Sequence, residues 1–225
     1  GNGHIAKPPL LLHLLPVADG PHTREQTVFK AHQKYMGKLQ TLGRVHGHHD
    51  CCIIAIIVLL QVCIEGNFFK DNDERAIFFA RGVLETVKKL RWAPDVIHCQ
   101  GWISQILPIY LKKAYIDDPI FSQSKIVLSL YDDMPTTDFS ADFKDRVAFG
   151  AVSAKDTEIL SEPTGINLAK LAISYSDGVI IGSEGVDQEL ISYCKEKGVP
   201  VLPYNAEALK DGSYIEDYNS FYDNL

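Results

Sequence analysis

Two short groups of polar and aromatic residues stand where a folded chain could bind a ligand. Asp71, Asn72 and Arg75 open a long amphipathic segment, while His98 and Trp102 lie at the end of a short apolar run. Carboxylate, amide, guanidinium and imidazole groups form hydrogen bonds, and an indole ring can stack on a bound molecule. In an α/β sheet, ligands collect at the carboxyl ends of the strands. The turn from His98 to Trp102 is therefore the first candidate for a binding site.

The segment between these two groups is predicted to be a helix followed by a buried strand. Residues Asn72–Leu90 carry apolar side chains at helical spacing, with acids near the start and bases near the end, as the helix dipole favours. Asp71 with Glu74 three residues later has the pattern of a capping box, so capping is the alternative to a binding role for Asp71. Residues 94–99 are expected to form the strand.

After residue 100 the pattern continues to alternate between helix and strand. We expect helices over residues 102–115, 166–176, 186–197 and 213–224, short helices around 143–149, and strands over 125–131, 178–182 and 199–202. Such alternation predicts an α/β fold, namely a Rossmann-like open parallel sheet with helices on both faces.

The two groups and the strand between them resemble the N-terminal catalytic domain of bacterial glycogen and starch synthases. Asp71, Asn72 and Arg75 match that family's D-N-x-x-R helix start, and the PDVIH sequence ending at His98, with Trp102 after it, matches its strand-end motif. Ser183 and Glu189 match a further motif of the family. The resemblance spans residues 66–225, and it looks most like a short, single-domain form found in Bacteroidetes.

This resemblance implies a fold similar to the N-terminal half of a GT-B glycosyltransferase. It implies transfer of glucose from ADP-glucose to an α-1,4-glucan, with an α-glucan and ADP-glucose as binding partners and no cofactor. By the same resemblance, Asp71 and His98 are the expected catalytic residues, and Asn72, Arg75, Trp102 and Ser183 are expected to bind substrate.

The sequence departs from the family motifs at positions that matter for the chemistry. Gln100, Gly101 and Ile103 replace a His, an Asp and a His of the strand-end motif, and isoleucine forms no side-chain hydrogen bond. The glycine-rich K-x-G-G-L loop, whose backbone N–H groups approach the phosphates, is also missing. Two functions therefore stay open: the glycosyltransferase, or a non-catalytic relic of the synthase that binds glucan or sugar nucleotide or has a regulatory role. If a separate protein supplies the nucleotide-binding domain, it is a further partner.

Each remaining candidate residue also has a purely structural interpretation. His98 could be a buried imidazole satisfied by the backbone, and Trp102 could be a packing residue. Ser183 could cap the helix that follows it. The sequence leaves these alternatives open.

Composition limits the class of protein. The chain has 225 residues, 46% of them hydrophobic, which is enough for one domain with a full core. The net charge of −7 argues against nucleic acid and anionic membranes as partners. Five cysteines without a paired framework favour a reducing, cytoplasmic setting. The longest apolar run, residues 51–60, is too short to cross a bilayer.

The chain divides near residue 66. Residues 1–65 do not resemble the family and form an atypical leader, in which residues 53–60 are predicted to be a buried strand. Residues 66–225 form the synthase-like domain. Residues 46–52 contain His, Asp and Cys, which are metal-ligand types, but no partner pair stands at the spacing of a structural zinc site. We therefore expect no functional metal site.

Overall fold

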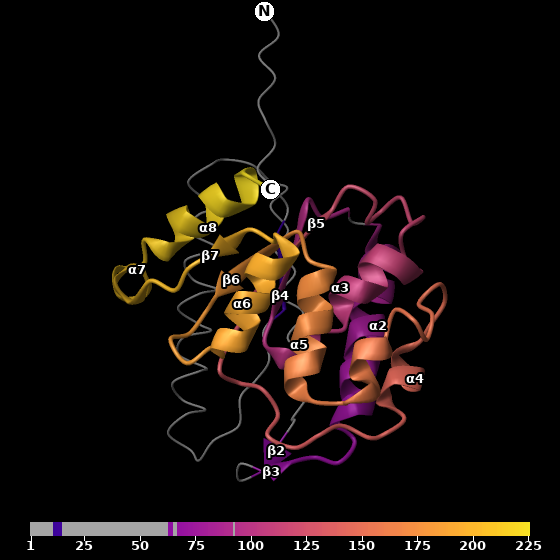
Figure 1. Ribbon diagram of the computed structural model, residues 1–225. Coiled ribbons are helices and arrows are strands. Elements are labelled where there is room, and N and C mark those ends of the chain that lie inside the picture. The colour runs from indigo at the N-terminus through magenta and orange to yellow at the C-terminus, as the bar shows by residue number, and fades with distance from the viewer. Residues whose placement is uncertain (1–10, 15–62, 65–66, 92) are drawn as a thin grey trace, which may run out of the picture.

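A five-stranded parallel sheet organises the chain in the computed structural model, which describes residues 11–14, 63–64, 67–91 and 93–225. The strand order is β1-β4-β5-β6-β7, and each neighbouring pair is parallel (Figure 1). The open parallel sheet predicted from the sequence is thus confirmed. The strands are β1 (Leu11–Leu14), β4 (Val96–Gln100), β5 (Lys125–Leu130), β6 (Gly178–Ile181) and β7 (Val201–Leu202).

Helices connect the strands because parallel neighbours need a crossover. The predicted helix over Asn72–Leu90 has the same bounds in the structure. The helices predicted around residues 143–149 and over 166–176, 186–197 and 213–224 correspond to α4, α5, α6 and α8, whose bounds lie within about two residues of expectation. The α-helices of the connections and the C-terminus are α2 (Asn72–Leu90), α4 (Phe143–Val147), α5 (Gly165–Ser174), α6 (Gln188–Lys197), α7 (Ala206–Asp211) and α8 (Tyr214–Asp223).

The prediction of one continuous helix over residues 102–115 is wrong. This segment consists of the 3-10 turn η1 (Trp102–Ser104), the short helix α3 (Leu107–Ile109) and the π-helical turn η2 (Tyr110–Ala114). The Ser104 hydroxyl bonds to the Gln100 and Gly101 carbonyls, which offers the backbone an alternative to a regular helix. Pro108 has no N–H to donate to the preceding turn, so the two features together interrupt the helix.

The two faces of the sheet are covered differently. Ile97, Leu128 and Val179 point to the face covered by α2, α3, α5 and α6, where the main hydrophobic core lies. Val127 and Ile180 point to the opposite face, against Tyr222 of α8 and its apolar neighbours. Helices therefore lie on both faces, as the alternation of side chains in buried parallel strands requires.

The sequence interpretation missed five elements of the described part. The edge strand β1 falls in the leader, yet it pairs with β4 from Leu11↔Val96 to Leu14↔Cys99. A small hairpin joins β2 (Cys63–Ile64) to β3 (Asn67–Phe68). The others are the 3-10 turn η3 (Glu158–Ser161) and α7. The division at residue 66 stays a prediction, and the strand predicted for residues 53–60 lies outside the described residues.

Gly82 lies in the interior of α2, where a Cβ would meet no atom within 4 Å. Because glycine costs the helix backbone entropy and the site has room for a methyl group, Gly82→Ala should raise the free energy of unfolding by about 0.5–1 kcal/mol. Urea unfolding measures this change. An unchanged or lower midpoint would contradict the open environment of Gly82.

Candidate functional site

The carboxyl ends of three neighbouring strands are tied together by the turn that follows β5. The Trp102 N–H, after β4, donates to Asp133 Oδ2 at 3.1 Å. The Asp132 N–H donates to Ser183 Oγ, after β6, at 3.0 Å. Tyr131 Oη donates to Gln100 Oε1 at 3.2 Å. We call this group the carboxyl-edge cluster; its residues are Gln100, Trp102, Tyr131, Asp132, Asp133 and Ser183.

Two glycines after β6 allow this close approach. A Cβ at Gly182 would lie 2.3 Å from the Tyr131 ring, and one at Gly185 would lie 2.8 Å from Asp132 Oδ2. Any larger residue at either position would push the turn after β5 away. The two glycines therefore set the distance between the ends of β5 and β6.

His98 lies on the other face of the sheet from the main core and is fully buried. Its Nε2 is 2.7 Å from Ser129 Oγ on β5, and its Nδ1 is 2.9 Å from Tyr222 Oη on α8. The imidazole is buried, as the structural interpretation expects, but its partners are the side chains of Ser129 and Tyr222 and not the backbone. Both ring nitrogens are thus engaged in joining β4, β5 and α8.

Trp102 is a packing residue in this structure. Only 2% of its surface is exposed, and its ring lies 5.8 Å from the Phe139 ring in the main core. The packing alternative is confirmed. The group that Trp102 presents at the carboxyl edge is its backbone N–H, bonded to Asp133.

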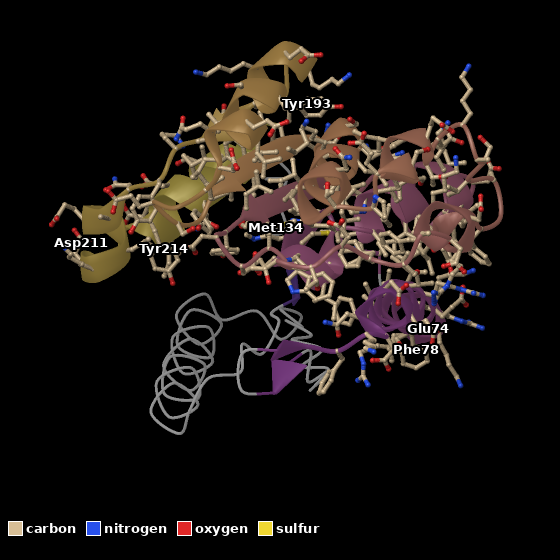
Figure 2. The ribbon with its side chains drawn as sticks, turned by 60° about the horizontal axis from the view of Figure 1, so that its bottom comes forward. Glu74, Phe78, Met134, Tyr193, Asp211 and Tyr214 are labelled. Atoms are coloured by element: carbon tan, nitrogen blue, oxygen red, sulfur yellow. The ribbon has the colours of Figure 1, made fainter. Side chains whose placement is uncertain are left out.

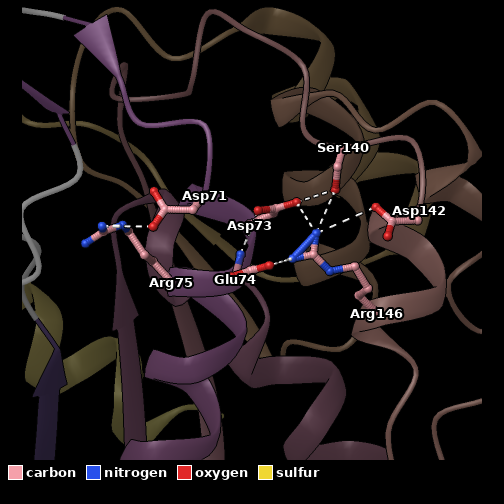
Figure 3. Close-up of polar contacts among 7 residues, drawn as sticks. All are labelled: Asp71, Asp73, Glu74, Arg75, Ser140, Asp142 and Arg146. Atoms are coloured by element: carbon pink, nitrogen blue, oxygen red, sulfur yellow. Dashed lines mark hydrogen bonds and ion pairs between the residues drawn. The ribbon is translucent and has the colours of Figure 1, made fainter.

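Asp71 and Arg75 form a pair at the start of α2. Their side chains are 2.9 Å apart and half to one-third exposed (Figure 3). The bond to Arg75 lowers the pKa of Asp71, so this carboxylate stays ionised. The predicted capping box is wrong, because Asp71 makes no side-chain cap bond and the Glu74 carboxylate instead pairs with Arg146. Asn72, beside the pair, is buried.

Next to this pair lies an ion cluster that the sequence interpretation did not find. Arg146 Nη1 is 2.9 Å from the buried carboxylate of Asp73, and Nη2 is 2.7 Å from Glu74 (Figure 3). Ser140 also bonds to Asp73, and Asp142 lies 3.6 Å from Arg146. The cluster joins α4 and its preceding loop to α2. No local pattern announces it, because its members are up to 73 residues apart.

The predicted site residues therefore fall into three places. Trp102 and Ser183 meet indirectly through Asp132 and Asp133, His98 points to the α8 face, and the Asp71–Arg75 pair stands at the start of α2. Ser183 does not cap the next helix, since α6 begins at Gln188 and is capped by Asp187. The sequence interpretation does not include Asp132 and Asp133 among the site residues. The pattern that could have marked them is a pair of acids directly after an apolar strand.

The described residues contain no group of three or more His, Cys, Asp or Glu side chains arranged to hold a metal ion. The histidines and cysteines of residues 46–52 lie outside the described part. Among the described helices, none combines the length and apolar character needed to span a bilayer.

Comparison with known proteins identifies the family. Residues 59–200 match the starch synthase catalytic domain, which is more than half of the chain. The chain belongs to the starch synthase catalytic-domain family.

Relatives in this family carry much longer chains. The chain is 33% identical to a glycogen synthase of Clostridium perfringens over 139 residues, which cover 62% of this chain and 27% of the relative. It is 35% identical to a glycogen synthase of Chlorobium limicola over 121 residues, covering 54% and 21%. The matched part thus spans about a quarter of these relatives. The catalytic domain of Arabidopsis thaliana starch synthase IV, solved with ADP and acarbose, aligns at 15% identity and a TM-score of 0.47, covering 61% and 30%.

In this member of the starch synthase family, one acidic side chain of the carboxyl-edge cluster is poorly solvated. Asp133 is mostly buried, which raises the pKa of its carboxyl group above the ordinary value of 3.8. Within the described part of the chain, Asp133 Oδ1 has no hydrogen-bond partner, and the buried Gln105 Oε1 has none either. A charged Asp133 therefore costs stability, which the bond from the Trp102 N–H offsets in part.

The raised pKa of Asp133 predicts the direction in which the free energy of unfolding changes with pH. Its pKa is higher in the folded than in the unfolded chain, so the folded state holds the extra proton between the two values and is most favoured at the acid end. The stability of the wild type relative to Asp133→Asn should fall as pH rises from about 4, then level off above the folded pKa. Urea unfolding of both proteins across pH measures the difference. Parallel curves would refute a buried, titrating Asp133.

The ion cluster yields a second test. Arg146→Met leaves the Asp73 carboxylate buried without its cation, and should lower the free energy of unfolding by about 2 kcal/mol after allowing for the partial exposure of Arg146. The matched control is Lys144→Met on the same helix, whose partner Glu158 is 68% exposed; it should cost less than about 0.5 kcal/mol. Equal losses of unfolding free energy in the two variants would show that the Asp73–Arg146 pair stabilises the fold no more than an exposed pair does.

Proposed function

We propose that this chain provides the glucan-facing part of a glycogen or starch synthase, which transfers glucose from ADP-glucose to the end of an α-1,4-glucan. The observation that supports it is the match to the starch synthase catalytic domain over residues 59–200. The polar carboxyl-edge cluster lies where ligands of open parallel sheets bind. We take the chain to correspond to the N-terminal half of a GT-B enzyme.

Within this proposal the residues have distinct roles. Asp71 and Arg75 at the start of α2, together with Asp132 and Ser183 at the carboxyl edge, contact the sugars. Asn72 is buried in the first turn of α2 and positions that turn. His98 and Trp102 act as positioning residues, because His98 already bonds through both ring nitrogens and Trp102 is packed in the core. His98 holds β4 against β5 and α8, and Trp102 fixes the turn that carries Asp133.

The transfer needs groups that the carboxyl-edge cluster of the described residues does not supply. Glucosyl transfer passes through a state with positive charge on the sugar and negative charge on the leaving phosphate, and both must be stabilised. Among the described residues, the carboxyl-edge cluster contains Asp132, Asp133 and Ser183 and no lysine or arginine. We therefore propose that the cations facing the phosphates come from a further nucleotide-binding region, in the same protein or in a separate one.

A second candidate is a module that binds glucan without catalysis. Ile103 favours it, because isoleucine stands where the family motif has the histidine expected to bond the transferred glucose, and here it is buried in the core. For either function we place the protein in the cytoplasm, which the free thiols of Cys99 and Cys194 support.

Binding and transfer separate the two candidates. In calorimetry, maltoheptaose should bind the purified chain, and Asp132→Asn should weaken binding about tenfold, since it removes a charge-assisted acceptor at the carboxyl edge. Asp145→Asn, an equally exposed aspartate on α4, is the matched control and should bind as the wild type does.

Transfer is then measured with radiolabelled ADP-glucose and glycogen, by counting label in precipitated glucan. The chain alone should give no label above the blank, and addition of the nucleotide-binding region should restore transfer. Restored transfer supports the synthase, and binding without transfer supports the binding module. Absence of maltoheptaose binding would rule out both.

A further inference from the structure

A row of side-chain hydrogen bonds runs from α8 to the carboxyl edge of the sheet. Tyr222 Oη on α8 is 2.9 Å from His98 Nδ1, and Gln100 Nε2 is 3.4 Å from the same nitrogen. Tyr131 Oη, directly after β5, donates to Gln100 Oε1 at 3.2 Å. We call Tyr222, His98, Gln100 and Tyr131 the α8 network. It links the C-terminal helix to the turn that follows β5.

The chemistry of the groups fixes the direction of each bond in the α8 network. An amide nitrogen only donates and an amide oxygen only accepts, so Gln100 bonds to Tyr131 and to His98 with opposite ends. His98 Nδ1 must therefore accept, and its Nε2 carries the hydrogen, which it donates to Ser129 Oγ at 2.7 Å. The Tyr222 hydroxyl donates to Nδ1 for the same reason. All members agree on one neutral tautomer of His98.

Burial makes the members of the α8 network depend on one another. The exposed fractions of His98, Tyr222 and Gln100 are 0%, 5% and 8%. In such a position bulk water does not replace a lost donor, so the remaining groups shift toward the atom that lost its bond. Loss of the Tyr222 hydroxyl therefore draws the Gln100 amide toward His98 Nδ1 and moves its Oε1 away from Tyr131.

Tyr131 passes such a change on to the carboxyl-edge cluster. Its ring packs so closely on Gly182 that a Cβ there would collide with it, so the ring has little room to take another position. The next residue, Asp132, donates its N–H to Ser183 Oγ. A shift of the Tyr131 hydroxyl therefore changes the turn that carries the polar groups of the edge.

α8 is held less firmly than the long helix of the main core. Among its residues only Tyr222 is buried, whereas α2 buries eight. Figure 2 shows the first turn of α8, marked by Tyr214, to one side of the turn after β5, marked by Met134. Elements with few buried side chains open locally at low cost in free energy. Docking and release of α8 is thus a two-state element that the α8 network connects to the carboxyl edge.

From these contacts we propose that α8 positions the carboxyl edge. When α8 is docked, Tyr222 holds His98 and Gln100 so that the Tyr131 hydroxyl and the turn after it are set for a ligand. Tyr222, His98 and Gln100 are positioning residues, since they act on the ligand through Tyr131. The effect of the α8 network on glucan binding rests on the proposed function.

The side-chain amide of Gln100 reports on the α8 network directly. In proton–nitrogen NMR spectra, Tyr222→Phe should shift the Gln100 Nε2–H signals, because the amide then has His98 Nδ1 as a stronger acceptor. Wild-type His98 should show the neutral tautomer with its hydrogen on Nε2. Tyr222→Phe keeps the ring that packs on Val127 and Ile180, so the variant should stay folded.

Tyr218→Phe is the matched control for the loss of a hydroxyl. The Tyr218 ring, on the same helix, lies 5.9 Å from the His98 ring, against 5.8 Å for Tyr222, but Tyr218 is not a member of the α8 network. The Gln100 signals should therefore stay in place in this variant. Unmoved Gln100 signals in Tyr222→Phe, or a His98 tautomer with the hydrogen on Nδ1, would overturn the proposal.

Calorimetry with maltoheptaose measures the effect on the ligand site. Tyr222→Phe should weaken binding about threefold, as expected when one weak hydrogen bond is lost, and Tyr218→Phe should bind as the wild type does. Tyr131→Phe breaks the α8 network at its other end, so adding Tyr222→Phe to it should cost no further affinity. Additive losses in the double variant would show two independent contacts and refute positioning through the network.

The two measurements separate this inference from the proposed function. If the wild type does not bind maltoheptaose, the proposed function fails, and the Gln100 signals still decide whether α8 positions the edge. If the wild type binds and Tyr222→Phe binds equally well, the proposed function stands and the positioning role of α8 is wrong.

Discussion

The bond from the Trp102 N–H to the buried carboxylate of Asp133 is the contact on which the carboxyl edge depends. Asp133 is held in a poorly solvated position, where an ionised oxygen is costly, and among the described residues only one of its two oxygens has a partner. The same turn places Asp132 against Ser183 and Tyr131 against Gln100. One short turn thus sets the relative positions of the ends of β4, β5 and β6, and with them the geometry of any ligand site there.

The two faces of the sheet differ in their contacts. One face holds the main apolar core, and the other combines apolar packing with buried hydrogen bonds. Side chains that alternate along β4 send Ile97 and Cys99 into the main core and His98 toward α8. On that second face the polar triad of His98, Ser129 and Tyr222 is buried, and a buried polar group is stable only when its partners are in place. α8 therefore does more than cover apolar strands, since its tyrosine completes the hydrogen bonding of the central histidine.

The sequence predicted well where one local rule decides the structure. α2 is set by its apolar stripe and β5 by a run of buried apolar residues, and both were found with accurate bounds. The prediction was wrong where two rules compete, as at Ser104 and Pro108, which break the helix after Trp102. It also missed what only the fold brings together. The Asp73–Arg146 pair joins residues 73 apart, and the bond between Trp102 and Asp133 spans 31 residues. His98 lies in β4 and Trp102 directly after it, but their burial depends on Phe139 and Tyr222, which no motif marks.

α2 is held in place by contacts on its inner side and by ion pairs at its first turn. Its inner side packs Phe79, Val83 and Val87 into the main core, so the helix is rigidly held. Its first turn is anchored from outside by Arg146, which neutralises part of the charge of Asp73 and Glu74. A helix fixed in this way can expose Phe78 without losing its position, because the cost of exposing one ring, about 1.5–3 kcal/mol, is small beside the burial of the opposite side.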